Sequence, residues 1–229
     1  MHYLVYNYKY FLIGALGILM LFRIARAIIY KELNLPRELV IIALALFVAF
    51  LSTQTFEPYQ IRVTGFKPSY NFVPLHSIQK ILARGISFNT PETKPLHFAI
   101  IYINLLGNVL VFMPVGFISP FLQKEPRWYK SLLAGLALSM TIEITQLFMI
   151  RRSFDVDDLL LNGLGTLLGY GAFKLFTLVP PFKRLASKTG ASDRAHGWIW
   201  AGAYVLSVIA LSLAIFLHQY RIYLDTPWG

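Results

Sequence analysis

The sequence predicts an all-α integral membrane protein with about six transmembrane helices and an amphipathic extracytoplasmic segment between the second and third. Of its 229 residues, 56% are hydrophobic and 14% are charged, whereas soluble domains carry roughly 25% charged residues. The mean hydropathy is +0.57. Apolar stretches near the roughly 20 residues that cross a bilayer recur along the chain. We therefore expect residues 1–229 to form a single transmembrane domain.

The candidate spans cover more than half of the chain: 11–30, 39–56, 98–122, 131–150, 159–179 and 198–218. The first is the weakest, because Arg23 and Arg26 follow its apolar run. Both side chains can snorkel to the interface if the helix end lies there. A cleavable signal peptide is the alternative, since Ala25-Arg26-Ala27 has the small-x-small form. An arginine inside the triplet is unfavourable for cleavage.

The distribution of Lys and Arg predicts the orientation of the chain in the membrane. The connections 23–37, 123–130 and 181–197 are denser in basic residues than those on the opposite side. The denser side is expected to be cytoplasmic, so both termini would be extracytoplasmic. A net charge of +10 then reflects basic loops facing anionic lipid. The basic residues are dispersed, so we expect no nucleic-acid partner.

The long connection 57–97 contains two short elements. Residues 59–64 alternate in polarity, which indicates a strand. Residues 75–88 place Leu75, Ile78 and Ile81 on one helical face and polar side chains on the other. This amphipathic helix either rests in the membrane interface or packs on the end of the bundle.

Glu143 is the only acidic residue inside any predicted span. Placing a carboxylate at a helix centre costs roughly 2.5–3.5 kcal/mol on insertion scales, so such a group normally faces the bundle interior or a cavity. Ser139 and Gln146 lie four residues before and three after it, which places all three on one helical face.

The third span carries Asn104 and Asn108 at helical spacing, with Gly107 permitting a close approach and Pro114 beyond. Three aspartates then precede the fifth span, where a helix dipole favours negative charge: Asp155, Asp157 and Asp158.

The fifth span continues with a stripe of small and polar residues, namely Asn162, Gly165, Thr166 and Gly169. The Gly-x-x-x-Gly spacing within it is typical of helix packing.

These polar groups lie at similar depths on three helices, as the rise of about 1.5 Å per residue indicates. We therefore expect a polar pocket open to the outer leaflet. Its expected ligand-binding residues are Asn104, Asn108, Glu143, Gln146, Arg152, Asp155, Asp157, Asp158 and Asn162. Structural interpretations remain open, because the aspartates could be helix caps paired with Arg151 and Arg152, and the asparagines could join helices.

Several motifs resemble the VanZ-like family of bacterial membrane proteins. They are Asn71-Phe-Val-Pro74, Asn104-Leu-Leu-Gly-Asn108, Glu143-Ile-Thr-Gln146, Arg152-Ser-Phe-Asp155-Val-Asp157-Asp158 and Asn162-Gly-Leu-Gly165. The resemblance covers about residues 71–171. It implies a cell-envelope protein related to low-level teicoplanin resistance in Gram-positive bacteria. Teicoplanin carries an acyl tail and targets the lipid-linked peptidoglycan precursor, so both are candidate partners beside membrane lipid.

Three functional hypotheses follow. The leading one is an intramembrane binding protein for a lipoglycopeptide or its lipid target. The second is an enzyme acting on a polyprenyl or glycolipid head group, with Glu143, Asp155 and Asp158 as candidate catalytic residues. In that case Mg²⁺ could bind the aspartates. The third is a lipid transporter. We expect no cofactor, and the absence of cysteine excludes a thiolate site.

Overall fold

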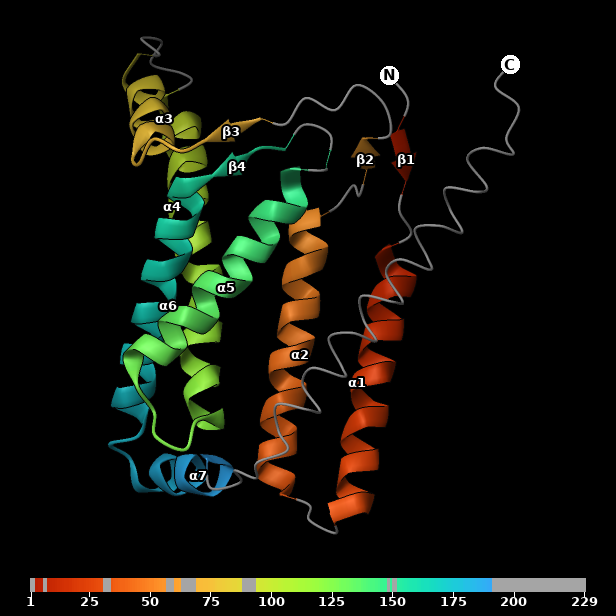
Figure 1. Cartoon of the computed structure of the whole chain (residues 1–229). Helices are drawn as coiled ribbons and strands as arrows, with labels where there is room; N and C mark the ends of the chain where they lie inside the picture. The colour runs from red at the N-terminus through yellow and green to blue at the C-terminus, as the bar shows by residue number, and fades with distance from the viewer. Residues whose placement is uncertain are drawn as a thin grey trace, which may run out of the picture.

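The computed structural model describes residues 3–5, 8–30, 34–56, 60–62, 69–87, 94–147, 149 and 152–190. It is a bundle of long helices with short elements at both ends (Figure 1). The long helices are α1 (Tyr8–Tyr30), α2 (Leu35–Phe56), α4 (Lys94–Ile118), α5 (Trp128–Leu147) and α6 (Val156–Phe176). One end carries α3 (His76–Ser87) and is called the α3 end. The other carries α7 (Pro180–Gly190) and is called the α7 end.

Three of the described helical segments are long and apolar enough to cross a membrane: Leu35–Thr53, Leu105–Leu122 and Val156–Phe176. They correspond to the second, third and fifth predicted spans. The first and fourth spans are also helical, as α1 and α5. The last one, 198–218, lies outside the described residues. The chain is thus a helical, multi-pass membrane protein, while the count of six spans and the orientation stay predictions.

Polar and apolar residues are distributed as expected for a bundle surrounded by lipid. Ser131, Ser139 and Thr166 are fully buried between helices. Large apolar side chains such as Phe50 and Leu133 are mostly exposed, at 58% and 62%. Soluble proteins seldom expose so much contiguous apolar surface, so hydrocarbon is the natural solvent for these faces.

The charge of Arg23 is compensated by an ion pair with another helix. Arg23 lies in α1 and forms a salt bridge with Glu38 in the first turn of α2. The partner lies near the N-terminus of α2, where the helix dipole favours a carboxylate. This ion pair helps to explain how the weakest predicted span carries a charge.

Helices α4 and α6 pack with their backbones in contact. A Cβ atom added to Gly165 would lie 2.1 Å from the carbonyl oxygen of Val109, and one added to Gly169 would lie 2.0 Å from that of Met113. These contacts confirm the predicted packing role of the Gly-x-x-x-Gly motif. The close approach expected at Gly107 is not seen, because no atom of the described residues lies within 4 Å of its Cβ position.

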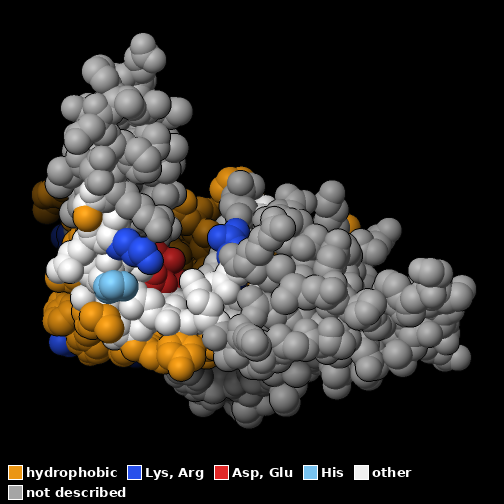
Figure 2. Space-filling model, turned by 90° about the horizontal axis from the view of Figure 1, so that it is seen from above, with side chains coloured by type: hydrophobic (Ala, Val, Ile, Leu, Met, Phe, Trp, Pro, Cys, Tyr) orange, Lys and Arg blue, Asp and Glu red, His pale blue; other side chains and the backbone are white. Residues whose placement is uncertain are grey.

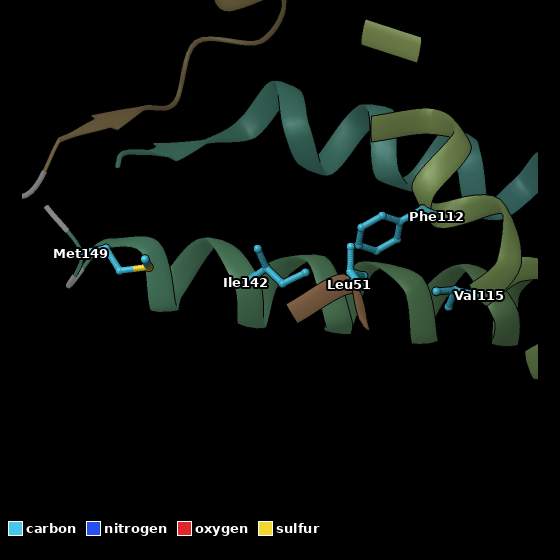
Figure 3. Close-up of a cluster of buried hydrophobic side chains, with 5 residues drawn as sticks. All are labelled: Leu51, Phe112, Val115, Ile142 and Met149. Carbon is cyan, nitrogen blue, oxygen red and sulfur yellow. The ribbon is translucent and has the colours of Figure 1, made fainter. Parts of the chain in front are cut away.

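A small apolar core joins α2 to α4 and α5. It consists of Leu51, Phe112, Val115, Ile142 and Met149 (Figure 3). The side chains come from segments far apart in the sequence, so their burial fixes α2 against the pair of helices that carries the polar residues. These contacts position the α3 end, where most of the expected site residues lie.

Short strands close the α3 end. Strand β1 (Tyr3–Val5) pairs antiparallel with β2 (Gln60–Arg62), and β3 (Tyr70–Asn71) pairs in parallel with β4 (Phe154–Asp155). The strand within 59–64 and the helix within 75–88 are confirmed, whereas the sequence pattern does not predict β1, β3 or β4.

The fifth predicted span, 159–179, ends earlier than expected. Helix α6 stops at Phe176, and α7 begins at Pro180 after a short turn. Figure 1 shows α7 lying across the end of the bundle rather than continuing α6. Two consecutive prolines, Pro180 and Pro181, begin α7, where missing N–H groups cost nothing in a first helical turn.

Candidate functional site

Asp155 joins β4 to α6 and is the N-cap of α6. Its carboxylate accepts a hydrogen bond from the backbone N–H of Asp157 at 3.0 Å. It also accepts from Asn71 Nδ2 at 3.1 Å and from Ser77 Oγ at 2.5 Å. Protein donors therefore engage both carboxylate oxygens, which is how a capping side chain satisfies the first turn of a helix.

Asp157 connects α6 to α3. One of its carboxylate oxygens accepts from the backbone N–H of Leu75 at 2.5 Å, and the other accepts from that of Ile78 at 3.1 Å. The side chain is 1% exposed. The first N–H groups of a helix have no partner within the helix, so Asp157 supplies the missing acceptors for α3.

The expected capping of the fifth span is thus confirmed for Asp155, whereas Asp157 caps α3 instead. Arg152 is exposed and donates to the backbone carbonyl of Thr55 at 3.3 Å. Between described residues, no ion pair joins Arg152 to an aspartate. Arg151 lies outside the described residues.

Asp158 differs from the other two aspartates. Its Oδ1 atom accepts from Asn108 Nδ2 at 2.6 Å, which links α6 to α4. Within the described part of the chain, its second carboxylate oxygen has no hydrogen-bond partner. Asn104 lies one turn earlier on α4, but its side chain is not among those described.

Glu143 lies on the face of α5 that packs against β4, and 1% of its surface is exposed. Its Oε2 atom accepts from the backbone N–H of Asp155 at 2.8 Å. The side chain therefore holds the start of α6 in place. Glu143 also interacts electrostatically with Asp155, Asp158 and Arg152.

The predicted polar face of α5 is confirmed, because Ser139 and Gln146 are buried with Glu143. Ser139 Oγ accepts from Asn162 Nδ2 at 2.9 Å, which joins α5 to α6. The Oδ1 atom of Asn162 is buried and has no hydrogen-bond partner among the described residues. The backbone carbonyl of Asn162 accepts from Thr166 Oγ1.

We define the acidic cluster as Glu143, Asp155 and Asp158, whose charges act on one another across α5, β4 and α6. Figure 2 shows the α3 end, where acidic side chains lie between basic ones. Among the described residues, no three acidic or histidine side chains gather as a metal ion would need. The oxygens of Asp155 and Asp157 already accept from protein donors, so these aspartates are not arranged as Mg²⁺ ligands.

An apolar strip borders the acidic cluster, and the sequence pattern does not predict it. It consists of Tyr70, Phe72, Val73 and Leu75, all largely exposed. The ring of Phe72 lies 5.3 Å from that of Phe154, the residue before Asp155. The strip therefore begins on β3, at Tyr70, and lies beside the residue that precedes Asp155.

Two further polar residues belong to the site, although sequence reasoning does not find them. Asn71 and Ser77 both bond to Asp155. Asn71 is part of one of the short family-like motifs, and Ser77 lies near the start of the predicted amphipathic helix 75–88. Nothing in their spacing indicates a partner 78 or more residues away. The contact depends on the pairing of β3 with β4.

A bundle of apolar helices with buried acids at one end is typical of a multi-pass membrane protein. The chain belongs to the VanZ/LLP1 family, which matches residues 38–177. The match confirms the resemblance and begins earlier than the expected 71–171, so that it includes nearly all of α2. No curated protein and no solved structure matches the chain significantly.

Proposed function

We propose that this protein binds the polar head of an amphiphilic, sugar-bearing molecule at the α3 end and thereby confers low-level resistance to teicoplanin. The ligand is the lipoglycopeptide itself or the lipid-linked peptidoglycan precursor that it targets. The observation that carries the proposal concerns Asp158, which is partly exposed and accepts a hydrogen bond from Asn108 through Oδ1. Among the described residues its other carboxylate oxygen has no partner, so we assign that oxygen to the ligand.

Asp158 is partly exposed, and its second carboxylate oxygen has no hydrogen-bond donor among the described residues. A charge-assisted hydrogen bond to this oxygen favours a ligand that is rich in donors. The unpaired Oδ1 atom of Asn162 is buried between α5 and α6, so we do not assign it a ligand contact. Sugar hydroxyls and amines supply such donors. Exposed Arg152 is suited to an anionic group of the same ligand.

The apolar strip of Tyr70, Phe72, Val73 and Leu75 supports an amphiphilic ligand. An acyl or polyprenyl chain that lies against it would bury apolar surface, at about 25 cal/mol for each Å² removed from water. The ligand head would then lie over the acidic cluster. Both candidate ligands combine a lipid chain with a sugar-bearing head.

The enzyme alternative is less well supported. Glu143, its candidate acid or base, is 1% exposed and already bonds the backbone of Asp155. A general acid or base must come within hydrogen-bond reach of the reacting group. We therefore assign Glu143 a positioning role and Asp158 the direct ligand contact.

The test is susceptibility to teicoplanin and vancomycin in a sensitive Gram-positive host. Wild type is expected to raise tolerance to teicoplanin selectively. Asp158→Asn keeps an acceptor for Asn108 but removes the charge, so the tolerance should disappear at an unchanged membrane protein level. Glu125→Gln is the matched control, because Glu125 is exposed and bonds Arg127 in the 123–127 loop.

Equal tolerance in wild type and Asp158→Asn would refute the assigned site. No tolerance with wild type would refute the resistance role, and a product formed from lipid-linked precursor by purified protein would favour the enzyme alternative.

A further inference from the structure

Helix α7 is amphipathic and lies across the end of the bundle (Figure 1). Its buried side consists of Thr189 and Gly190, with Leu185 and Ala186 partly buried. Its opposite side carries exposed Lys183, Arg184 and Lys188. An amphipathic helix that lies across the end of a transmembrane bundle is suited to the membrane interface.

Several contacts fix α7 to the rest of the α7 end. Arg37, in the first turn of α2, donates through Nη1 to the carbonyl oxygens of Leu122 at 3.2 Å and Thr189 at 2.6 Å. Asn34 Nδ2 donates to the carbonyl of Lys188 at 2.7 Å. The position of α7 is therefore set by the bundle, and its basic side chains remain on the outside.

The basic surface continues beyond α7. The Cβ position of Gly190 lies 3.6 Å from the Cα of Lys124, which places the end of α7 beside the 123–127 loop. Lys130 follows this loop and is exposed. On α6, Lys174 lies over the ring of Tyr170, whose hydroxyl donates to the carbonyl of Pro126.

Among the described residues, no carboxylate pairs with a basic side chain of α7, whereas Glu125 also acts on the charges of Lys124 and Lys130. Among the described residues of the α7 end, Glu125 bonds Arg127 and Glu38 bonds Arg23. Lys183, Arg184 and Lys188 have no acidic partner within the described part of the chain. Apolar and aromatic side chains flank the basic ones, with Trp128 at 55% exposure, as is typical of the membrane interface.

We propose that the basic face of α7, formed by Lys183, Arg184 and Lys188 and continued by Lys124 and Lys130, binds the head groups of anionic phospholipids. The occupant follows from charge complementarity and from the place of the surface beside α6, a helix apolar enough to span the membrane. A soluble polyanion would contact the charges but would leave the flanking aromatic side chains in water. Each Lys or Arg near such a lipid surface strengthens the association severalfold.

The experiment measures the thermal stability of the purified full-length protein in neutral detergent while phosphatidylglycerol or phosphatidylcholine is titrated. Phosphatidylglycerol should raise the midpoint of unfolding, and the effect should weaken as ionic strength rises. In the variant Lys183→Gln/Arg184→Gln/Lys188→Gln, the phosphatidylglycerol concentration that gives half of the shift should rise about 100-fold.

Two control variants distinguish a loss of charge on α7 from a general effect on folding. The variant Lys183→Arg/Arg184→Lys/Lys188→Arg keeps the charges and should respond as wild type does. Lys80→Gln removes one exposed charge from α3 at the other end and should also respond as wild type does. An equal response to phosphatidylcholine would overturn the proposal, as would an unchanged response of the triple glutamine variant. Stabilisation by heparin but not by phosphatidylglycerol would also overturn it.

Discussion

Asp157 holds the backbone of Leu75 in a left-handed conformation. The φ angle of Leu75 is 65°, and its N–H donates to Asp157 Oδ1. A non-glycine residue in this region costs on the order of 1–3 kcal/mol and persists where its surroundings impose it. The same carboxylate accepts from Ile78. A side chain at the start of α6 therefore fixes the start of α3, although the two segments are about 80 residues apart in the sequence.

Removing this carboxylate should release α3. Asp157→Ala leaves the N–H groups of Leu75 and Ile78 without acceptors, and hydrogen bonds to a charged group contribute about 1.5–3 kcal/mol each. We expect a marked fall in the midpoint of thermal unfolding in detergent. Asp157→Asn keeps one acceptor, so its midpoint of unfolding should lie between those of the alanine variant and wild type. An alanine variant as stable as wild type would contradict the capping role.

The α4–α6 contact should not tolerate a methyl group. In Gly169→Ala the new Cβ atom would lie 2.0 Å from the carbonyl oxygen of Met113, so the helices must separate. Overpacking typically costs about 1–3 kcal/mol. Gly171→Ala is the control on the same helix, because no atom of the described residues lies within 4 Å of its Cβ position. The midpoint of thermal unfolding should be lower for Gly169→Ala than for Gly171→Ala. Equal midpoints would contradict backbone contact between α4 and α6.

The bond between Asn108 and Asp158 should be measurable as a coupling. In a double-mutant cycle with Asn108→Ala and Asp158→Ala, we expect an interaction free energy of about 0.6–2 kcal/mol, the range for polar contacts between membrane helices. Reversible unfolding in mixed micelles provides the measurement. Additive effects would show that the bond between the two side chains contributes nothing to stability.

Arg37 should attach α7 to the bundle. Arg37→Gln shortens the side chain and loses the donors to Leu122 and Thr189, so α7 should open at its C-terminal end. Limited proteolysis within 180–190 should become faster, while the rest of the bundle stays protected. Protection equal to that of wild type would contradict this role.

The sequence predicts the helices better than it predicts their partners. Glu143, Asn162 and the glycine stripe can be recognised because a polar or small residue in an apolar helix normally faces a neighbouring helix rather than lipid. The close approach expected at Gly107 is not seen among the described residues, because spacing alone does not tell which face of α4 meets α6. The roles of Asp155 and Asp157 as clamps on Ser77 and α3 depend on the β3–β4 pair, and strands this short carry little periodic signal.

Helix α7 is another element that the sequence pattern alone does not predict. Its residues have the composition of a basic loop after the fifth span, since Lys183, Arg184 and Lys188 dominate it. The apolar spacing of Phe182, Leu185 and Ala186 is too short to predict a helix by itself. Contacts with α2 and the 123–127 loop supply the missing stabilisation.

The most direct test of the proposed function is binding of fluorescently labelled teicoplanin to the full-length protein in lipid nanodiscs, with and without lipid-linked precursor. We predict saturable binding of the drug or of the precursor by wild type and by Glu125→Gln. In Asp158→Asn the affinity should fall at least about tenfold, as expected for the loss of one charged hydrogen bond. Equal affinity of Asp158→Asn and wild type, or no binding of either ligand, would contradict the account.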